Sequence, residues 1–194
     1  EMCLVVVAWR AHPHYPLIVA ANRDEFHARP AAPAAPWPDA PGLIAGRDLQ
    51  AGGTWLGVDR ARRFGVITNF RELVRPRRSA PSRGGFIPDY LNGGATAAEF
   101  LSRIEVDAPA YAGFSLLLAD ASGLWYGSNR ADSFARQLPA GIYGLSNHLL
   151  DTPWPKLLRV REQLRQWLAS LEDPSQADLQ PLFSESGLIR HRVL

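Results

Sequence analysis

Apolar runs separated by short polar turns fill most of the chain, a pattern typical of antiparallel hairpins. The first run, Cys3–Trp9, is almost continuously apolar, and a second run, Leu17–Ala21, follows after a turn. Because a continuously apolar strand is buried on both faces, we expect this hairpin to lie between layers. The later expected strands are Leu43–Gly46, Thr54–Val58, Phe64–Thr68, Gly113–Asp120, Gly123–Ser128, Ser133–Leu138 and Ile142–Leu145.

The last four of these strands are expected to form two further hairpins. One joins Gly113–Asp120 to Gly123–Ser128, and the other joins Ser133–Leu138 to Ile142–Leu145. By contrast, Ala28–Gly42 is rich in proline and alanine and has no periodicity. We expect this segment to be a surface loop that forms a wall or lid of a site.

Helical periodicity marks four other segments. Thr96 and Glu99 occupy the two positions of a capping box, so a helix is expected to begin there. Thr152 is the expected N-cap of the longest helix, with Pro153 at its first position. The expected helices are Phe86–Leu91, Thr96–Ile104, Pro153–Leu171 and Ala177–Phe183.

The order of these elements predicts an α+β fold, because hairpins with helices grouped between them do not give a parallel sheet. Two antiparallel sheets covered by helices fit this order best. The length of 194 residues suits a single domain, which we place at residues 2–194.

Composition and charge narrow the class of protein. The chain is 46% hydrophobic and 21% charged, as in ordinary soluble globular proteins. No apolar run reaches the ~20 residues that span a bilayer, and the start lacks the basic residues of a signal peptide. A single cysteine excludes an intramolecular disulfide. We therefore expect a cytoplasmic protein without integral membrane association.

The basic residues are unevenly distributed, although the formal net charge is only +2. They could bind an anionic phosphate or carboxylate, but a solvated loop face is the favoured interpretation. Nucleic acid is not expected as a partner, because no base-stacking motif accompanies the charges. The arginines of the first half include Arg60, Arg62, Arg63, Arg71, Arg75, Arg77, Arg78 and Arg83.

The only cysteine, Cys3, directly follows Met2 and is a candidate nucleophile. Removal of the methionine would leave a thiol and a free α-amine on one residue. The amine, with a pKa near ~8, can act as the base for its own side chain. The alternative is a small buried residue at the head of a strand, which is the commoner role of a lone cysteine.

Polar clusters follow several of the apolar runs. The tetrad Asn22–Glu25 closes the second strand, where Arg23 and Asp24 form either a functional pair or a structural ion pair. The glycines of Gly52–Gly57 allow a ligand to approach the backbone, and Trp55 offers an apolar floor, although a hairpin turn also explains them.

Asn69 and Asn147 each come just after an apolar run. An asparagine amide can donate a hydrogen bond to an oxyanion, a contact that contributes about 3 kcal/mol to catalysis. Either asparagine alone is more often a turn residue. No HxxH, HExxH or paired-cysteine spacing is present, so no metal site is expected.

Six sequence motifs resemble those of the NRDE family and occur in the same order along the chain. The eukaryotic members of this family are called transport and Golgi organisation protein 2. The NRDE string and Leu150–Lys156 (LDTPWPK) are its most specific parts. The family in turn resembles the N-terminal nucleophile (Ntn) hydrolases, which implies an Ntn-hydrolase-like αββα sandwich of two antiparallel sheets between helix layers. The motifs are Met2-Cys3, Asn22–Glu25, Gly52–Gly57, Thr68–Arg71, Ser82–Gly84 and Ser146–Lys156.

Bile-salt and penicillin-V amidases are the closest analogy within those hydrolases. The resemblance implies that Cys3 is the nucleophile, that Asp24 orients its amine, and that Asn69 and Asn147 bind the oxyanion. The amidases carry an arginine immediately before their motif asparagine. This chain has Ala21 before the corresponding asparagine, Asn22, and its arginine, Arg23, follows Asn22 instead.

The first functional hypothesis is therefore a cysteine hydrolase of non-peptide C–N amide or ester bonds in small acyl substrates. Cys3 attacks the carbonyl, its amine moves the proton, and Arg23 with Asp24 holds the amine and thiolate. This reaction needs no cofactor. The expected substrate-binding residues are Asn22, Glu25, Gly53, Trp55, Arg71 and Arg83.

The second hypothesis is a non-catalytic binding or trafficking protein for haem, acyl-CoA or lipid-like anions, as the family's roles in Golgi organisation, lipid metabolism and haem handling imply. The arginine-rich loops and several tryptophans would hold the amphipathic anion. A cysteine or histidine would ligate haem iron, although each histidine also fits a surface turn. The residues concerned are Cys3, His12, His14, His148, Trp37, Trp55 and Trp154.

Two departures from the family pattern bear on these hypotheses. Glu1 precedes Met2, so in the printed chain the terminal amine belongs to Glu1 and self-activation of the cysteine is blocked. The family's late strand with a Thr-Arg-Ser motif is also absent after Phe183. We therefore expect the C-terminal part of the chain, residues 184–194, to be a truncated or divergent form of the corresponding family region.

Overall fold

A computed structural model describes residues 3–23, 28–72 and 80–170 of the chain. The contacts divide it into two compact units. Unit 1 comprises Glu1–Asp24 with Pro139–Leu194, and unit 2 comprises Glu25–Leu138. Each unit contains one antiparallel sheet, so the described residues have the predicted α+β character. The stacking of layers implied by the Ntn resemblance stays a prediction.

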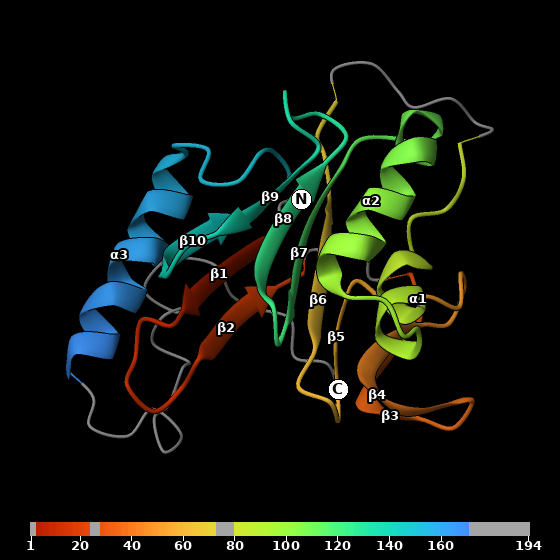
Figure 1. Cartoon of the computed structure of the whole chain (residues 1–194), viewed down its shortest axis with the longest axis horizontal. Coiled ribbons are helices and arrows are strands. Elements are labelled where there is room, and N and C mark those ends of the chain that lie inside the picture. The colour runs from red at the N-terminus through yellow and green to blue at the C-terminus, as the bar shows by residue number, and fades with distance from the viewer. Residues whose placement is uncertain (1–2, 24–27, 73–79, 171–194) are drawn as a thin grey trace. The chain divides into compact units, whose positions relative to one another are not determined.

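Unit 1 is a three-stranded sheet covered by one helix (Figure 1). Its strand order is β10-β1-β2, and all six residues of the central strand are buried, as its apolar run predicts. Alternate residues of β1 pack with the buried face of the helix. The elements are β1 (Leu4–Trp9), β2 (Leu17–Asn22), β10 (Gly141–Leu145) and α3 (Pro155–Ser170).

The helix α3 begins two residues later than predicted. The Thr152 hydroxyl donates to the carbonyl of Leu149 at 2.7 Å. Pro155, the second proline of the string, is the first helical residue. Either proline suits a first helical position, because that position needs no N–H donor.

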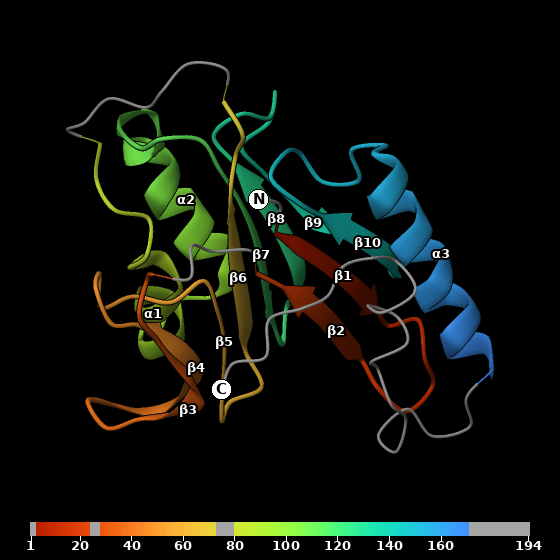
Figure 2. The same cartoon turned by 180° about the vertical axis from the view of Figure 1, so that it is seen from behind.

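Unit 2 is a seven-stranded sheet whose strands follow sequence order from β3 to β9. Helices α1 and α2 lie against this sheet (Figure 2) and bury their apolar residues in its core. The elements are β3 (Ala31–Trp37), β4 (Ala40–Asp48), β5 (Leu56–Asp59), β6 (Phe64–Asn69), α1 (Phe86–Asn92), α2 (Ala97–Asp107), a 3-10 turn (Ala108–Ala110), β7 (Phe114–Asp120), β8 (Gly123–Ser128) and β9 (Ala135–Leu138).

The capping box of α2 forms as predicted. The backbone N–H of Glu99 donates to the Thr96 hydroxyl, and the Glu99 carboxylate accepts from the backbone N–H of Thr96 at 2.8 Å. These bonds satisfy donors that the first helical turn would otherwise leave unpaired. The helix therefore begins one residue after Thr96.

The predicted loop Ala28–Gly42 is wrong over most of its length. Residues Ala31–Trp37 form β3, which pairs with β4 at one end of the sheet. Pro33 and Pro36 hid this strand, because proline cannot donate to a central ladder. Both are tolerated on an edge strand, whose outer side needs no partner.

The predicted hairpin of Ser133–Leu138 with Ile142–Leu145 is also wrong. β9 pairs with β8, whereas β10 pairs with β1 in the other sheet. The short spacing between the two runs suggested a hairpin, but the chain passes from one unit to the other there. The predicted helix Ala177–Phe183 lies outside the described residues.

Candidate functional site

Cys3 directly precedes β1, the central strand of unit 1, so both neighbouring strands flank it. The register between β1 and β2, continued by one residue, places Arg23 opposite Cys3. The register between β1 and β10, continued by two residues, places Asn147 opposite Cys3 on the other side. Antiparallel pairing therefore brings Asn147, one of the predicted catalytic residues, to the cysteine.

Two hydrogen bonds hold the backbone of Cys3. Its N–H donates to Oδ1 of Asn147 at 2.8 Å, and the Ser146 hydroxyl donates to its carbonyl oxygen at 2.5 Å. Because a backbone N–H only donates, the oxygen of the Asn147 carboxamide faces it. Ser146 is buried, whereas Cys3 and Asn147 are partly exposed. Cys3 is thus fixed at the margin of the core.

Strand alternation determines the face on which the cysteine lies. Leu4, Val6 and Ala8 pack in the cluster that contains α3. Because successive side chains of a strand point to opposite faces, the Cys3 position belongs to the other face. The thiol position is therefore separated from the helix-covered core by the sheet itself.

The string Leu150–Lys156 forms the turn that connects Asn147 to α3. Asp151 has a φ of 57°, its N–H donates to the Gly144 carbonyl at 2.8 Å, and its carboxylate accepts the Gly144 N–H at 2.7 Å. Arg161 of α3 pairs with the same carboxylate at 3.0 Å. These contacts fix the end of β10, so this part of the motif supports the site structurally.

Unit 1 also contains a cavity of about 590 Å³ beside the turn between β1 and β2. Ile142 and Leu168 contribute apolar surface, and His12, His14 and Arg165 also line it. The His14 N–H donates to Nδ1 of His12 at 3.2 Å, so Nδ1 is the acceptor nitrogen of that imidazole. As the alternative interpretation of the histidines predicts, both lie in the turn after β1.

In unit 2, two glycine motifs touch through their backbones. A Cβ placed on Gly53 would lie 2.3 Å from the carbonyl oxygen of Gly84. The next residue, Thr54, donates its N–H to that same oxygen at 3.2 Å. Gly53 is therefore needed for close approach of two chain segments.

The strand-end motif of Asn69 belongs to the same region of unit 2. The Gly113 carbonyl accepts from the Phe70 N–H at 2.9 Å and from Nη1 of Arg83 at 2.6 Å. The Trp55 carbonyl accepts from a β6 N–H at 2.8 Å, and its side chain packs against the unit 2 core. The contacts join the predicted binding residues Gly53, Trp55 and Arg83 to the end of β6.

Asp48 builds the loop that precedes Gly53. Its carboxylate accepts the N–H groups of Gln50 and Ala51 at 2.9 and 3.0 Å and pairs with Arg29 at 2.6 Å. Burial alone would raise the pKa of Asp48, but the Arg29 contact and the backbone donors outweigh it and lower that pKa.

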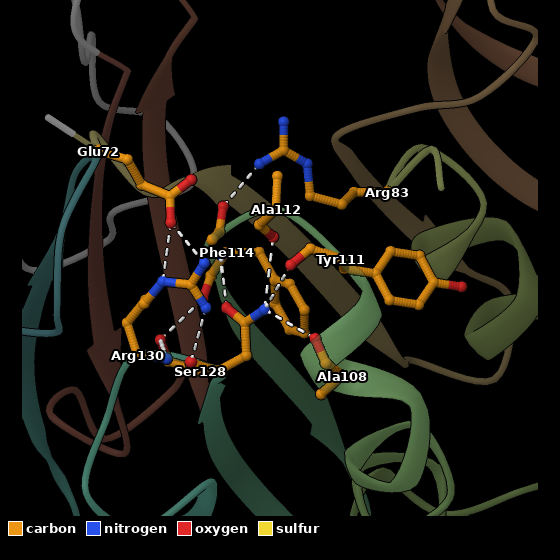
Figure 3. A network of polar contacts seen from close by, with 10 residues as sticks. Glu72, Arg83, Ala108, Tyr111, Ala112, Phe114, Ser128 and Arg130 are labelled. Carbon is orange, nitrogen blue, oxygen red and sulfur yellow. Dashed lines mark hydrogen bonds and ion pairs between the residues drawn. The ribbon is translucent and has the colours of Figure 1, made fainter. Parts of the chain in front are cut away.

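Sequence reasoning missed the polar network of Figure 3, in which Glu72 pairs with Arg130. Asn129 donates to the carbonyls of Ala108 and Tyr111 at 2.9 and 3.3 Å, and its Oδ1 accepts from a β7 N–H. A signal was present, because Ser128-Asn129 follows an apolar strand just as Ser146-Asn147 does.

The other predicted site residues divide between the units and the undescribed segments. Asn22 ends β2 in unit 1, and Asn69 ends β6 in unit 2, where it is exposed, as is Arg71. Asp24 and Glu25 lie outside the described residues. Among residues 3–23, 28–72 and 80–170, no three potential metal ligands cluster and no helix is long and apolar enough to cross a bilayer.

Comparison with known proteins gives consistent matches. The family model described as Transport and Golgi organisation 2 matches residues 2–191. The Transport and Golgi organization protein 2 homolog of Bos taurus is 35% identical over 168 residues, which cover 80% of this chain and 60% of the relative. The Mus musculus homolog gives 35% over 170 residues with the same coverage. The matched region thus spans about three-fifths of these relatives.

Proposed function

The chain belongs to the Transport and Golgi organisation 2 family, and we propose that it acts as an N-terminal cysteine hydrolase of small amides or esters. The observation that carries this proposal is the hydrogen bond from the Cys3 N–H to Oδ1 of Asn147 at 2.8 Å. Removal of the two preceding residues would convert that N–H into the α-amine. The amine would then form with a hydrogen-bond acceptor already beside it.

The Asn147 oxygen has a defined part in this reaction. By accepting one proton of the amine, it orients the nitrogen lone pair, while the Ser146 hydroxyl fixes the other end of Cys3. The amine takes the thiol proton, and the sulfur attacks the carbonyl carbon of the substrate. The resemblance assigned Asn147 to the oxyanion, a role that would use its Nδ2 donors instead of Oδ1.

The remaining steps return the enzyme to its starting state. The ammonium gives its proton to the leaving nitrogen or oxygen as the bond to the carbonyl carbon breaks, which leaves a thioester on Cys3. Water, deprotonated by the amine, then attacks the thioester; the carbon–sulfur bond breaks to release the acid, and the ammonium returns its proton to the departing sulfur. Arg23, opposite Cys3 in the register, is proposed to hold the thiolate. The role of Asn69 as an oxyanion donor stays a prediction.

This proposal is tested with a chain whose first residue is Cys3. Its hydrolysis of a panel of N-acyl amides and acyl esters is compared with that of the Cys3→Ala variant. We expect turnover by the first protein and loss to background in the variant, because the reaction needs the sulfur. Equal turnover by the two proteins would contradict the proposal.

A binding function is a second candidate, and the cavity beside His12 and His14 favours it. A cavity that combines imidazole, guanidinium and apolar groups suits an amphipathic anion. Titrations with haem and with an acyl-CoA test it, with His12→Ala as the variant. Saturable micromolar binding that the variant weakens would support this function, and its absence would exclude it.

A further inference from the structure

Arg83 is a half-buried cation in unit 2 whose described contacts leave most of its donors unused. Nη1 donates to the Gly113 carbonyl at 2.6 Å. Figure 3 shows another guanidinium nitrogen of Arg83 directed away from Glu72 and Arg130. A guanidinium has five N–H donors and usually engages oxygen atoms in pairs.

The other partly buried arginines in the described part of unit 2 have a different environment. The guanidinium of Arg63, for example, lies 2.6 Å from Asp59 and also donates to three carbonyls at the end of α1. Among the described residues, no carboxylate lies within ion-pairing distance of Arg83. The arginines of unit 2 that do have a carboxylate are Arg29, Arg47, Arg63 and Arg130.

The surrounding charges do not balance that of Arg83. Glu72 is the nearby carboxylate, but it already pairs with Arg130, whose positive charge repels Arg83. Burial, together with this repulsion, lowers the pKa of Arg83 despite the attraction of Glu72. Arg71, directly before Glu72 in the chain, is exposed and adds positive charge to the region. An additional negative group here would be stabilised.

The position of Arg83 is fixed before any ligand arrives. The next residue, Gly84, is held against Gly53 by backbone contact, and the Gly113 carbonyl that binds Arg83 also binds the Phe70 N–H. We propose that Arg83 anchors an anion site on unit 2 that binds the carboxylate or phosphate group of a ligand. Every contact that supports this anion site lies within unit 2, so the site can be tested without the cysteine chemistry.

The test is an NMR titration of the unaltered 194-residue chain with inorganic phosphate and, separately, with acetate. Chloride keeps the ionic strength constant, and the side-chain Nε–H signals of arginine are recorded. We expect saturable movement of the Arg83 signal with at least one anion, and the stronger of the two identifies the preferred group. An Arg83 signal that moves with neither anion would overturn the proposal.

Matched variants separate this site from general attraction of anions. Arg83→Gln removes the charge but keeps an amide donor for Gly113, and Arg60→Gln makes the same charge change at an exposed position of the same unit. We expect Arg83→Gln to weaken binding about tenfold or more and Arg60→Gln to weaken it about twofold or less. Equal weakening by the two variants would also overturn the proposal.

Discussion

The backbone nitrogen of Cys3 lies 2.8 Å from Oδ1 of Asn147, although 144 positions separate the two residues in the chain. This contact follows from the sheet, because β1 lies between β2 and β10 and the β10 register ends beside the cysteine. A side-chain acceptor is therefore fixed at the atom that would become the catalytic amine.

The first prediction concerns Asn147→Ala in a chain that begins at Cys3. Without the Oδ1 acceptor, the ammonium is no longer held beside the sulfur, so less thiolate is present at neutral pH. A hydrogen bond to a charged group contributes about 1.5–3 kcal/mol, so alkylation of Cys3 should slow by about tenfold or more. The measurement is the rate of iodoacetamide addition, followed by intact mass.

The control for this experiment is Asn92→Ala, at the exposed end of α1. This variant removes the same amide group without touching Cys3, and its alkylation rate should match that of the unaltered chain. An unchanged rate in Asn147→Ala would show that the 2.8 Å contact has no influence on the thiol.

The second prediction concerns Gly53→Ala. The added Cβ would lie 2.3 Å from the Gly84 carbonyl oxygen, a backbone atom that cannot move without displacing its loop. We expect the free energy of unfolding to fall by about 2–3 kcal/mol, measured by urea denaturation. Gly94→Ala is the matched control, since its Cβ would meet nothing within 4 Å. Equal stability of the two variants would refute the close approach.

The third prediction concerns Arg63, which caps the end of α1. Its guanidinium donates to the carbonyls of Tyr90 and Gly93 at 3.1 and 2.7 Å and pairs with the buried Asp59. Arg63→Ala leaves Asp59 without this partner, so the free energy of unfolding should fall by about 3 kcal/mol. Thermal or urea denaturation measures it, with the exposed Arg60→Ala as the control. A loss no larger than that of the control would argue against the cap.

The fourth prediction concerns pH and Asp48. Because its pKa is lower in the folded chain than the unfolded value of about 3.9, its contribution is present above about pH 4. That contribution disappears as the pH falls through the folded pKa. Asp48→Asn should therefore cost about 1–3 kcal/mol of unfolding free energy near pH 6 and clearly less near pH 3.

Asp39→Asn is the comparison for this pH experiment. Asp39 pairs with Arg47 on the surface, where solvent screens the pair. We expect its effect on stability to be small at both pH values. If the difference in unfolding free energy between the unaltered chain and Asp48→Asn stayed constant with pH, the Asp48 carboxylate would not be the source of this pH-dependent stability.

The sequence predicted the elements whose signal is local. Continuous burial of β1 followed from its apolar run, and the start of α2 followed from the Thr96–Glu99 box. The placement of Asn147 at the end of a strand was also predicted from the apolar run before it. In each case the residues that form the feature lie within a few positions of one another.

Features that depend on distant partners could not be predicted in this way. Prediction of β3 would have required knowing that this strand lies at a sheet edge, where its prolines are tolerated. The separation of β9 from β10 depends on two different sheets, which a short loop does not reveal. The Gly113 carbonyl joins Phe70 to Arg83, but a backbone acceptor leaves no mark in the residue pattern.

The most direct test of the account compares two forms of one chain that differ only at the start. One begins at Cys3, and the other keeps Glu1 and Met2. Each is mixed with an activated acyl ester, and the intact mass of the protein is followed together with release of the acid. We predict an acyl adduct on Cys3 and repeated turnover only when Cys3 is the first residue. Equal turnover by the two forms, or no adduct in either, would contradict the account.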